Sequence, residues 1–204
     1  MPTNPDSKGY PLSGAVLAGG SSRRLGGRDK TRLRFGSQSL LERTISLLDV
    51  ICDEILISSN TLHDHPQGRI IPDLEKNQGP LGAINSCLRE ARHPYLLIVA
   101  GDMPFIELPA LRKLWQEREN FDVILPQTPD GLQPLTALYN KNCLPAIESN
   151  LKQNHLKIKS FFGSVRVKTI PCAFFPESFP KNTFLNINSP EDLRAARSLY
   201  GAWN

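Results

Sequence analysis

The sequence predicts an α/β fold in which a mostly parallel sheet lies between two layers of helices. Short apolar, β-branched runs alternate along the chain with longer segments of helical periodicity. Several of these runs are apolar almost without interruption, which is typical of parallel strands covered on both faces. The length of 204 residues suits one domain with a full three-layer core that needs neither disulfides nor a metal.

The first half of the chain shows strands and helices in regular alternation. Residues 14–19 (GAVLAG) form an apolar run that ends on glycine, and residues 38–51 carry leucine and isoleucine at helical spacing. Two further strands are predicted at 54–59 (EILISS) and 69–73 (RIIPD), and the second of them ends on a carboxylate. The next helix, 79–91, begins with GPLGA, where a proline in the first turn costs nothing.

The second half contains the strand that we expect to be most deeply buried, residues 94–102 (PYLLIVAGD). A helix over 107–119 and a strand over 122–126 follow it, and beyond them the pattern is less regular. We expect strands at 134–140, 165–170 and 184–188, and helical segments at 143–153 and 157–163. Ser189 is the expected N-cap of the last helix, because a proline and two acidic residues follow it directly.

The composition is that of an ordinary globular protein and argues against several function classes. The net charge is 24 − 20 = +4, which suits anionic small ligands but falls short of the basic face of a nucleic-acid-binding protein. The four cysteines form no C-x-x-C or Cys/His cluster, so we expect reduced, mostly buried thiols, no zinc site and a cytoplasmic location. We expect neither a signal peptide nor a membrane-spanning segment. Residues 1–12 are polar with three prolines and are predicted to be a disordered extension of a single domain, 13–204.

A glycine-rich segment, AVLAGGSSRRLGGRDK (residues 15–30), includes the end of the first predicted strand. It lacks the spacing of a P-loop and that of a dinucleotide-binding turn, which argues against a P-loop kinase or an NAD enzyme. Gly19 and Gly20 lie at the carboxyl end of the strand, where α/β sheets bind ligands and a base or phosphate can approach the backbone closely. Arg24 and Lys30 add cations that suit phosphate, although a solvated surface role stays open for the arginine.

The same segment resembles the L-A-G-G-x-S/A-x-R-M/L-G-x-x-K motif of nucleotidyltransferases, and the resemblance covers residues 14–196. After LAGGSSRRLGGRDK come IIPD, GPLGAI, GDMPFI, QPLTALYN, KIKSFFGSVRVKTIP and LNINSPEDL, in that order. The doubled glycine, the GGRDK form and the short length favour the molybdenum cofactor guanylyltransferases over sugar-nucleotide and isoprenoid cytidylyltransferases. The resemblance implies a three-layer α/β/α, Rossmann-like fold of the nucleotide-diphospho-sugar transferase class with a mostly parallel central sheet.

The resemblance also implies an activity, which is transfer of GMP from GTP to the terminal phosphate of molybdenum-molybdopterin. The products are the molybdopterin guanine dinucleotide cofactor and pyrophosphate, and the implied cofactor is Mg²⁺. The implied partners are GTP and molybdenum-molybdopterin, the latter handed over by molybdopterin-inserting proteins. We expect a monomer or a weak homo-oligomer, with neither a nucleic acid nor a membrane as partner.

The family's site residues carry over onto the matching positions of this chain. The residues that the resemblance implies bind GTP are Leu17, Ala18, Gly19, Gly20, Arg24, Lys30, Ser58, Asp73 and Asp102. Lys30 and Asp102 are the implied catalytic residues, and Asp102 is also the implied metal ligand. In relatives an asparagine stands at the position of Ser58, and Asn60 follows two residues later, so which of the two makes that contact stays open. Gln133, Asn186 and Asn188 are candidates for the acceptor or metal shell.

The predicted reaction suits these residue types on physical grounds. Attack at an α-phosphate moves charge onto its non-bridging oxygens and onto the pyrophosphate, so catalysis consists mostly of positioning and charge neutralisation. Lys30 supplies a cation, and Asp102 supplies a hard oxygen ligand of the kind that Mg²⁺ takes from protein. No general base is required, because the attacking group is already an anionic phosphate.

Two alternatives remain open at this point. A related nucleotidyltransferase would use CTP on molybdopterin, or would act on another phosphorylated acceptor; the LAGG turn favours guanine through the resemblance. A non-catalytic nucleotide sensor on the same scaffold is the other alternative. Retention of Lys30 and Asp102 argues against it, because a degenerate copy would lose the metal ligand first.

Overall fold

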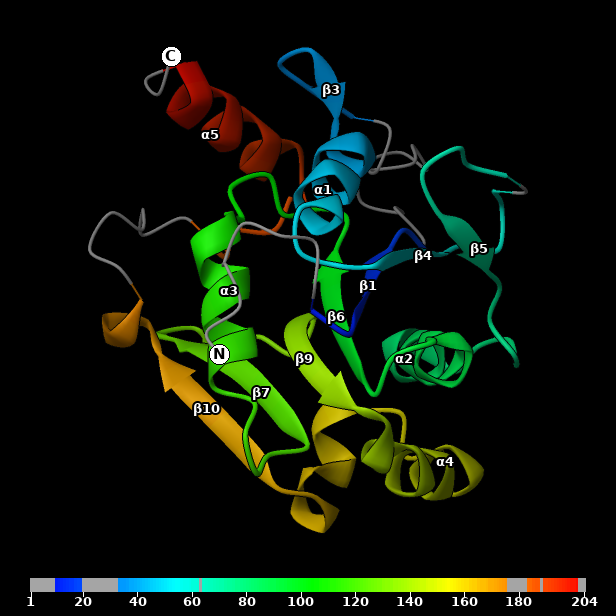
Figure 1. Cartoon of the computed structure of the whole chain (residues 1–204). Helices are drawn as coiled ribbons and strands as arrows, with labels where there is room; N and C mark the ends of the chain where they lie inside the picture. Colours follow the sequence, from blue (N-terminus) through cyan, green and yellow to red (C-terminus); the bar gives the residue numbers. More distant parts are fainter. Residues whose placement is uncertain (1–9, 20–32, 63, 176–182, 188, 202–204) are drawn as a thin grey trace.

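The chain folds into a mixed β-sheet with helices on both faces (Figure 1). The computed structural model describes residues 10–19, 33–62, 64–175, 183–187 and 189–201. In this part of the chain the main sheet has the strand order β10-β7-β9-β6-β1-β4-β5, with β8 paired to β7. Its strands are β1 (Leu12–Leu17), β4 (Glu54–Ser58), β5 (Arg69–Ile71), β6 (Tyr95–Ala100), β7 (Val123–Thr128), β8 (Gly131–Leu132), β9 (Thr136–Asn140) and β10 (Val167–Pro171). The helices are α1 (Leu40–Asp49), α2 (Gly79–Glu90), α3 (Leu108–Gln116), α4 (Leu144–Lys152) and α5 (Pro190–Gly201).

The directions of the strands confirm a mostly parallel sheet. β1 is parallel to both of its neighbours, β4 and β6, and β5 and β10 are parallel to β4 and β7. β9 is antiparallel to β6 and β7, and β8 is antiparallel to β7. From β1 the chain passes through α1 to β4 on one side, and it returns through α2 to β6 on the other side. The change of winding direction therefore lies between β1 and β6, the position where open α/β sheets bind ligands.

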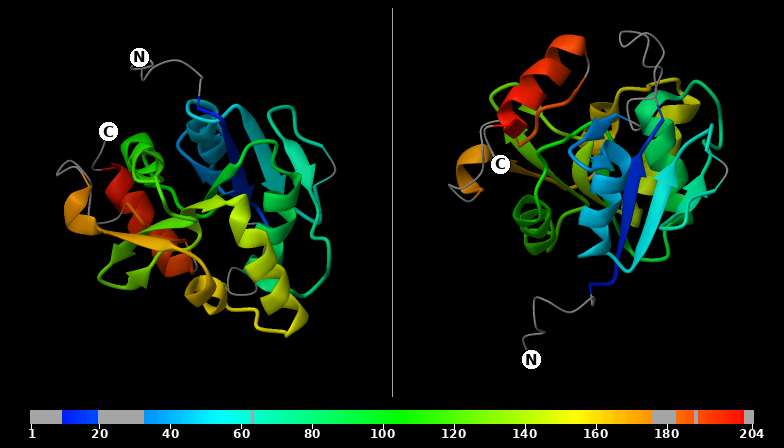
Figure 2. Two further views of the ribbon diagram at one scale, coloured as in Figure 1. Left: turned by 60° about the horizontal axis from the view of Figure 1, so that its bottom comes forward. Right: turned by 90° about the horizontal axis from the view of Figure 1, so that it is seen from above.

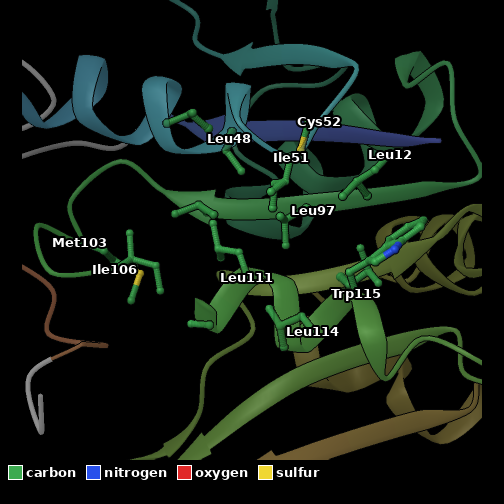
Figure 3. Packing of buried hydrophobic residues seen from close by; sticks show 14 of the residues in the cluster. Leu12, Leu48, Ile51, Cys52, Leu97, Met103, Ile106, Leu111, Leu114 and Trp115 are labelled. Atoms are coloured by element: carbon green, nitrogen blue, oxygen red, sulfur yellow. The ribbon is translucent and has the colours of Figure 1, made fainter. Parts of the chain in front are cut away.

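Two hydrophobic clusters, one on each face of the sheet, confirm the predicted three layers. On one face, Leu48 of α1 and Leu111 and Leu114 of α3 pack with Leu97 of β6 (Figure 3). On the other face lie α2 and α4, side by side, and both views in Figure 2 show helices on two sides of the strands. Burial of these side chains supplies most of the free energy of folding, at roughly 1.5–3 kcal/mol for each fully buried large residue.

The last helix, α5, packs at one end of this arrangement. Its Ala196 forms a third buried cluster with Leu40 and Phe105 and with Ile187. Ser189 caps the helix as predicted, because Asp192 N donates to Ser189 Oγ at 3.1 Å and Ser189 N donates to Asp192 Oδ2 at 2.8 Å. The helix thereby holds the preceding segment, 183–187, against the turn that follows β6.

Several predicted elements differ from the observed ones. Residues 184–187 form no strand, because the amide of Ile187 donates to the carbonyl of Asp102 in a turn at 2.9 Å instead of entering a ladder; Asn188 lies outside the described residues. The segment predicted to be helical at 157–163 is a 3-10 helix, Ile158–Ser164. A small hairpin of β2 (Arg34–Phe35) and β3 (Gln38–Ser39) was not predicted, since two-residue strands are too short to show periodicity.

The boundary of the predicted N-terminal extension also shifts. Leu12 is fully buried as the first residue of β1, and the ring of Tyr10 lies 5.3 Å from that of Trp115 in an edge-on contact. Residues 10–12 are thus part of the packed domain, because these apolar side chains cover one end of the α3 layer. The predicted disorder of residues 1–9 falls outside the described residues.

Three of the four cysteines are buried thiols, as the sequence predicts for most of them. All four are free, and Cys52, Cys87 and Cys143 are buried, whereas Cys172 is partly exposed. Burial raises the pKa of the Cys87 and Cys143 thiols to about 12, so both are protonated at neutral pH. Among the helices of the described segments, none has the length and apolar character needed to cross a bilayer.

An ion-pair cluster joins the α3 layer to the edge strand β10. Glu117, the C-cap of α3, accepts from Lys113 Nζ at 2.6 Å and from Lys168 Nζ on β10 at 2.6 Å. Hydrogen bonds from these two ammonium groups lower the pKa of Glu117 from 4.5 to about 2. Lys168 also lies 5.0 Å from the centroid of the Phe121 ring.

Acid is expected to weaken this cluster and, with it, the contact between α3 and β10. Because the folded pKa of Glu117 lies below its unfolded value, the stabilisation is complete above about pH 5 and is lost as the pH falls from 4.5 toward 2. The three side chains are a quarter to a third exposed, so solvent screening limits the gain to roughly 1 kcal/mol. Urea unfolding of wild type and Glu117→Gln should therefore differ most at pH 7, differ less at pH 3 and converge near pH 2. Glu119→Gln, on the exposed turn after α3, is the control; an undiminished difference at pH 3 would contradict the assignment.

Candidate active site

Six of the predicted site residues that the structure describes lie where four parallel strands end at one edge of the sheet, namely Leu17, Ala18, Gly19, Ser58, Asp73 and Asp102. Strand register places Leu17 at the end of β1 opposite Ala100 of β6 on one side and Ser58 of β4 on the other. Ser58 in turn pairs with Ile71 of β5. The residues that follow each strand therefore emerge from the same edge, on both sides of the change in winding direction.

Backbone hydrogen bonds also join the first residues after β1 and β6 to the neighbouring strands. Ala18 N donates to Ser58 O at 3.0 Å, and Gly101 N donates to Leu17 O at 3.1 Å. Gly19 is exposed, and a Cβ atom there would meet Ser58 O at an ordinary contact distance of 3.9 Å. The main chain of the Leu17–Gly19 turn is therefore anchored on both sides while its glycine leaves the backbone accessible.

Asp102 lies in the turn after β6, where its neighbours in the sequence are buried. Its neighbour Met103 is buried and accepts a hydrogen bond from the Thr136 hydroxyl of β9, with Oγ1 and Sδ 2.8 Å apart. Ile187 N donates to the carbonyl of Asp102 at 2.9 Å, and Arg43 Nε of α1 donates to the carbonyl of Pro104 at 2.8 Å. Three separate elements thus hold this turn, two through its backbone carbonyls and one through the side chain of Met103, and Asp102 is partly exposed in it.

Asp73 follows β5 and is held by a side chain from the neighbouring loop. Asn60 Nδ2 donates to Asp73 Oδ2 at 2.7 Å, and Asp73 N donates to Asn60 Oδ1 at 2.9 Å. The next residue, Leu74, donates its amide to Ser86 Oγ of α2 at 3.0 Å. Asp73 is therefore fixed between the loop after β4 and the second half of α2.

α2 begins at the same edge and brings its N-terminal amides there. Gly79 has φ = 60°, a backbone conformation that glycine adopts without strain, and it allows the chain to turn into the helix. A Cβ atom on Gly82 would lie 2.5 Å from Cβ of Gln78, so this glycine allows the close first turn. Gln78 makes no side-chain cap on the helix, and the free amides of a helix N-terminus attract anions.

Ser58 is placed differently from its neighbours at the edge. Its side chain is only 2% exposed, and its hydroxyl hydrogen-bonds the thiol of Cys87 in α2. Its carbonyl accepts from Ala18 N. The side chain thus faces the α2 layer, and a contact from it to a nucleotide stays a prediction.

The acceptor-half candidates lie in two further segments. Gln133 precedes β9, and its Nε2 donates to Thr128 Oγ1 at 2.9 Å and to Gly131 O at 3.4 Å, which holds the side chain within the β7–β9 connection. Asn186 is partly exposed and adjoins Ile187, the residue that contacts Asp102. Gly20, Arg24, Lys30 and Asn188 lie outside the described residues.

The pairing of Asn60 with Asp73 is a feature that the sequence alone does not predict. The two residues lie 13 positions apart, and only the parallel register of β4 and β5 brings their loops together. The signal that could have found it is an amide side chain shortly after one strand and a carboxylate after the next. Within the described segments no three His, Cys, Asp or Glu side chains come together as a metal cluster.

The chain is similar in sequence to known proteins of one family. The family model described as "MobA-like NTP transferase domain" matches residues 14–167. A probable molybdenum cofactor guanylyltransferase of Pelotomaculum thermopropionicum is 35% identical over 91% of both chains. A molybdenum cofactor guanylyltransferase of Desulfosudis oleivorans is 32% identical over 92% of this chain and 95% of its own.

A solved structure is similar as well. The crystal structure of molybdopterin-guanine dinucleotide biosynthesis protein A from Archaeoglobus fulgidus matches with a TM-score of 0.77 and 26% identity, covering 93% of this chain and 99% of that one. The match confirms the predicted nucleotide-diphospho-sugar transferase fold, and the family model and the relatives confirm the resemblance seen in the sequence. The chain belongs to the MobA-like NTP transferase family and is a nucleotidyltransferase.

Proposed function

We propose that this protein is a molybdenum cofactor guanylyltransferase, which transfers GMP from GTP to the terminal phosphate of molybdenum-molybdopterin. The observation that carries the proposal is the row of strand ends that brings the Leu17–Gly19 turn, Asp73 and Asp102 to one edge of the sheet. The names of two relatives that are 32–35% identical over nine-tenths of the chain support the same substrates.

The reaction is a displacement at the α-phosphate of GTP. A terminal phosphate oxygen of the pterin attacks the α-phosphorus, a new P–O bond forms, and the bond to the bridging oxygen of the β-phosphate breaks. The electron pair leaves with pyrophosphate, and no proton has to be removed from the attacking phosphate. The chain must therefore hold two anionic substrates in line and neutralise their charge.

The described residues can divide this work between nucleoside and phosphates. The backbone at Gly19, which is exposed, and at Ala18, which is partly exposed, provides a surface for the base or ribose, and the N-terminus of α2 favours nearby negative charge. In the proposal Lys30 binds the β- and γ-phosphates, and Gly20 and Arg24 also bind GTP. Gln133, Asn186 and Asn188 belong to the acceptor side or the metal shell.

Mg²⁺ is the proposed cofactor, with Asp102 as its ligand from protein. The donor chemistry fits, because the turn after β6 presents a hard carboxylate oxygen, and Mg²⁺ in nucleotide sites takes one or two protein carboxylates together with phosphate oxygens and water. When bound, the ion would neutralise charge that develops on the phosphates in the transition state. Asp102 holds its place through backbone contacts on both sides of the turn.

The remaining parts of the proposal concern the setting of the enzyme. We propose a cytoplasmic enzyme that acts as a monomer or a weak homo-oligomer. It would receive molybdenum-molybdopterin from the proteins that insert molybdenum. Neither a nucleic acid nor a membrane is part of the proposed activity.

GTP is expected to support turnover with molybdenum-molybdopterin far better than CTP does. The guanine edge offers two adjacent N–H donors to a carboxylate, whereas cytosine offers a single amino group. A buried donor or acceptor that loses its partner with CTP is expected to lower kcat/KM about a hundredfold. Pyrophosphate release measured with GTP, CTP and ATP at equal Mg²⁺ decides between them. Equal or better use of CTP would show that the related cytidylyl transfer is the true activity.

A further inference from the structure

The side chain of Asn60 is committed to Asp73 on two sides. Its Nδ2 donates to Asp73 Oδ2 at 2.7 Å, and its Oδ1 accepts from the backbone amide of the same residue at 2.9 Å. The assignment of the amide atoms follows from chemistry, since a backbone N–H can only donate and an ionised carboxylate can only accept. One amide group therefore fixes both the backbone and the carboxylate of Asp73.

The loops that carry the two residues are themselves held in place. Ser59 N donates to Ile71 O at 3.1 Å, and Ser59 Oγ accepts from Leu62 N at 3.1 Å, which fixes the turn around Asn60. On the other side, Leu74 N donates to Ser86 Oγ of α2. The hydrogen bonds of Asn60 join two fixed loops, so they select one orientation of the Asp73 carboxylate.

The placement of this pair argues for a role in ligand binding more than in folding. Asn60 is exposed and Asp73 partly exposed, so neither side chain fills the core. Both stand at the edge where Ala18 N contacts Ser58 O, next to the exposed turn at Gly19. A carboxylate repels the phosphates of a nucleotide and is complementary to the N–H and O–H groups of its nucleoside.

From this geometry we infer that Asn60 is a positioning residue, which holds the Asp73 carboxylate ready to accept hydrogen bonds from the nucleoside of GTP. The inference rests on the proposed function and deepens it. It assigns Asn60 a role through Asp73, so that Asn60 makes no direct contact with the nucleotide. Asp73 is then the group that contacts the nucleotide. Because Asn60 already holds the Asp73 carboxylate in one orientation, no free energy has to be spent on ordering that carboxylate when GTP binds.

The test compares Asn60→Ala with a matched control at the opposite edge of the sheet. Asn142, which follows β9, is also exposed and also hydrogen-bonds an aspartate, Asp122. Asn60→Ala is expected to raise the Kd and KM for GTP about tenfold, the value typical of losing a hydrogen bond to a charged group, with kcat changed less than about threefold. Asn142→Ala should leave both constants unchanged. Isothermal titration with GTP and Mg²⁺ and steady-state kinetics give these values.

A double variant separates positioning from a merely structural effect. If Asn60 acts through Asp73, Asn60→Ala combined with Asp73→Ala should bind GTP no more weakly than Asp73→Ala alone. Additive losses, an unchanged KM in Asn60→Ala, or a fall in kcat and thermal midpoint without a selective rise in KM would each overturn the inference. Failure of the wild type to bind GTP would instead contradict the proposed function itself.

Discussion

Asp102→Asn is expected to reduce guanylyl transfer by about a thousandfold or more, the range seen when a charge that stabilises the transition state is removed. The substitution keeps the size of the side chain and one oxygen, but it removes the negative charge that we propose holds Mg²⁺. Turnover should fall at every pH, and added Mg²⁺ should restore little of it. Measuring pyrophosphate release against Mg²⁺ concentration, up to tens of millimolar, checks both statements.

The fold is expected to survive this substitution, which makes the result interpretable. The anchors of the turn that the structure shows are backbone contacts, namely Gly101 N to Leu17 O and Ile187 N to the carbonyl of Asp102. Asp53→Asn is a suitable control, because Asp53 is partly exposed before the start of β4, at the opposite edge, where it pairs with His93 at 3.6 Å. Near wild-type turnover in Asp102→Asn would refute the metal assignment.

The positions of the strand ends could be predicted because hydrophobic periodicity is strong where strands are buried on both faces. The six residues from Tyr95 to Ala100 are apolar without interruption, and β6 (Tyr95–Ala100) is correspondingly buried between the two helix layers. A carboxylate directly after such a strand must emerge at the sheet edge, so the location of Asp102 follows from local sequence. The same reasoning places Asp73 after β5.

The contacts between these loops could not be predicted, because they depend on register and on distant segments. Asn60 meets Asp73 only because β4 and β5 pair with Ser58 opposite Ile71. A short strand was predicted at 184–188, yet the amide of Ile187 donates to the carbonyl of Asp102, in a turn 85 residues earlier in the chain. Periodicity describes which residues are buried, and it carries no information about which buried partner they meet.

The burial of Ser58 shows the same limit at the level of a single side chain. The resemblance places Ser58 at the end of the second predicted strand, and in the structure Ser58 is the last residue of β4. Alternation along β4, however, turns its hydroxyl toward Cys87 of α2. A site residue that is assigned from its sequence position alone can therefore lie at the predicted edge of the sheet while its side chain faces one of the helix layers.

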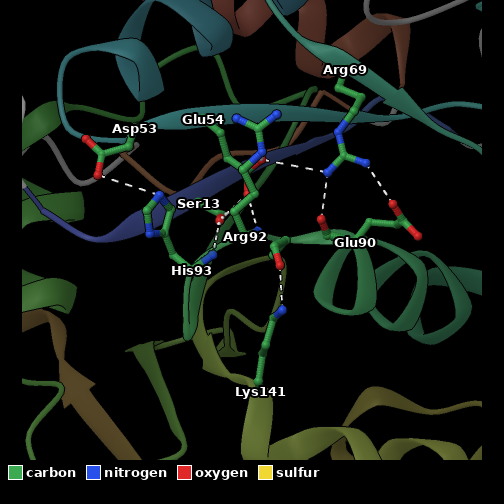
Figure 4. Close-up of polar contacts among 9 residues, drawn as sticks. Ser13, Asp53, Glu54, Arg69, Glu90, Arg92, His93 and Lys141 are labelled. Carbon is green, nitrogen blue, oxygen red and sulfur yellow. Dashed lines mark hydrogen bonds and ion pairs between the residues drawn. The ribbon is translucent and has the colours of Figure 1, made fainter.

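Glu54→Ala is expected to lower the free energy of unfolding by about 2–4 kcal/mol, as typical for removing a buried, hydrogen-bonded charge. Glu54 begins β4 at the edge opposite the candidate site, and its side chain is only 8% exposed (Figure 4). Its Oε1 accepts from Ser13 Oγ of β1 at 2.6 Å and from the backbone amide of Arg92. Its Oε2 lies 3.7 Å from Arg69 Nη2 and 3.5 Å from Arg92 Nε.

Glu90, which also pairs with Arg69, supplies the matched control for this prediction. Arg69 Nη1 also pairs with Glu90 Oε2 at 2.7 Å, but the side chain of Glu90 is 50% exposed, so Glu90→Ala should cost less than about 1 kcal/mol. Urea unfolding at pH 7 measures both variants. Equal losses would show that the ion pair with Arg69, which the two glutamates share, is what matters. A loss confined to Glu54→Ala would show that the stabilisation comes from its bonds to Ser13 and to the amide of Arg92. Those bonds tie the starts of β1 and β4 to the segment that enters β6, so they hold in register the three strands whose opposite ends form the candidate site.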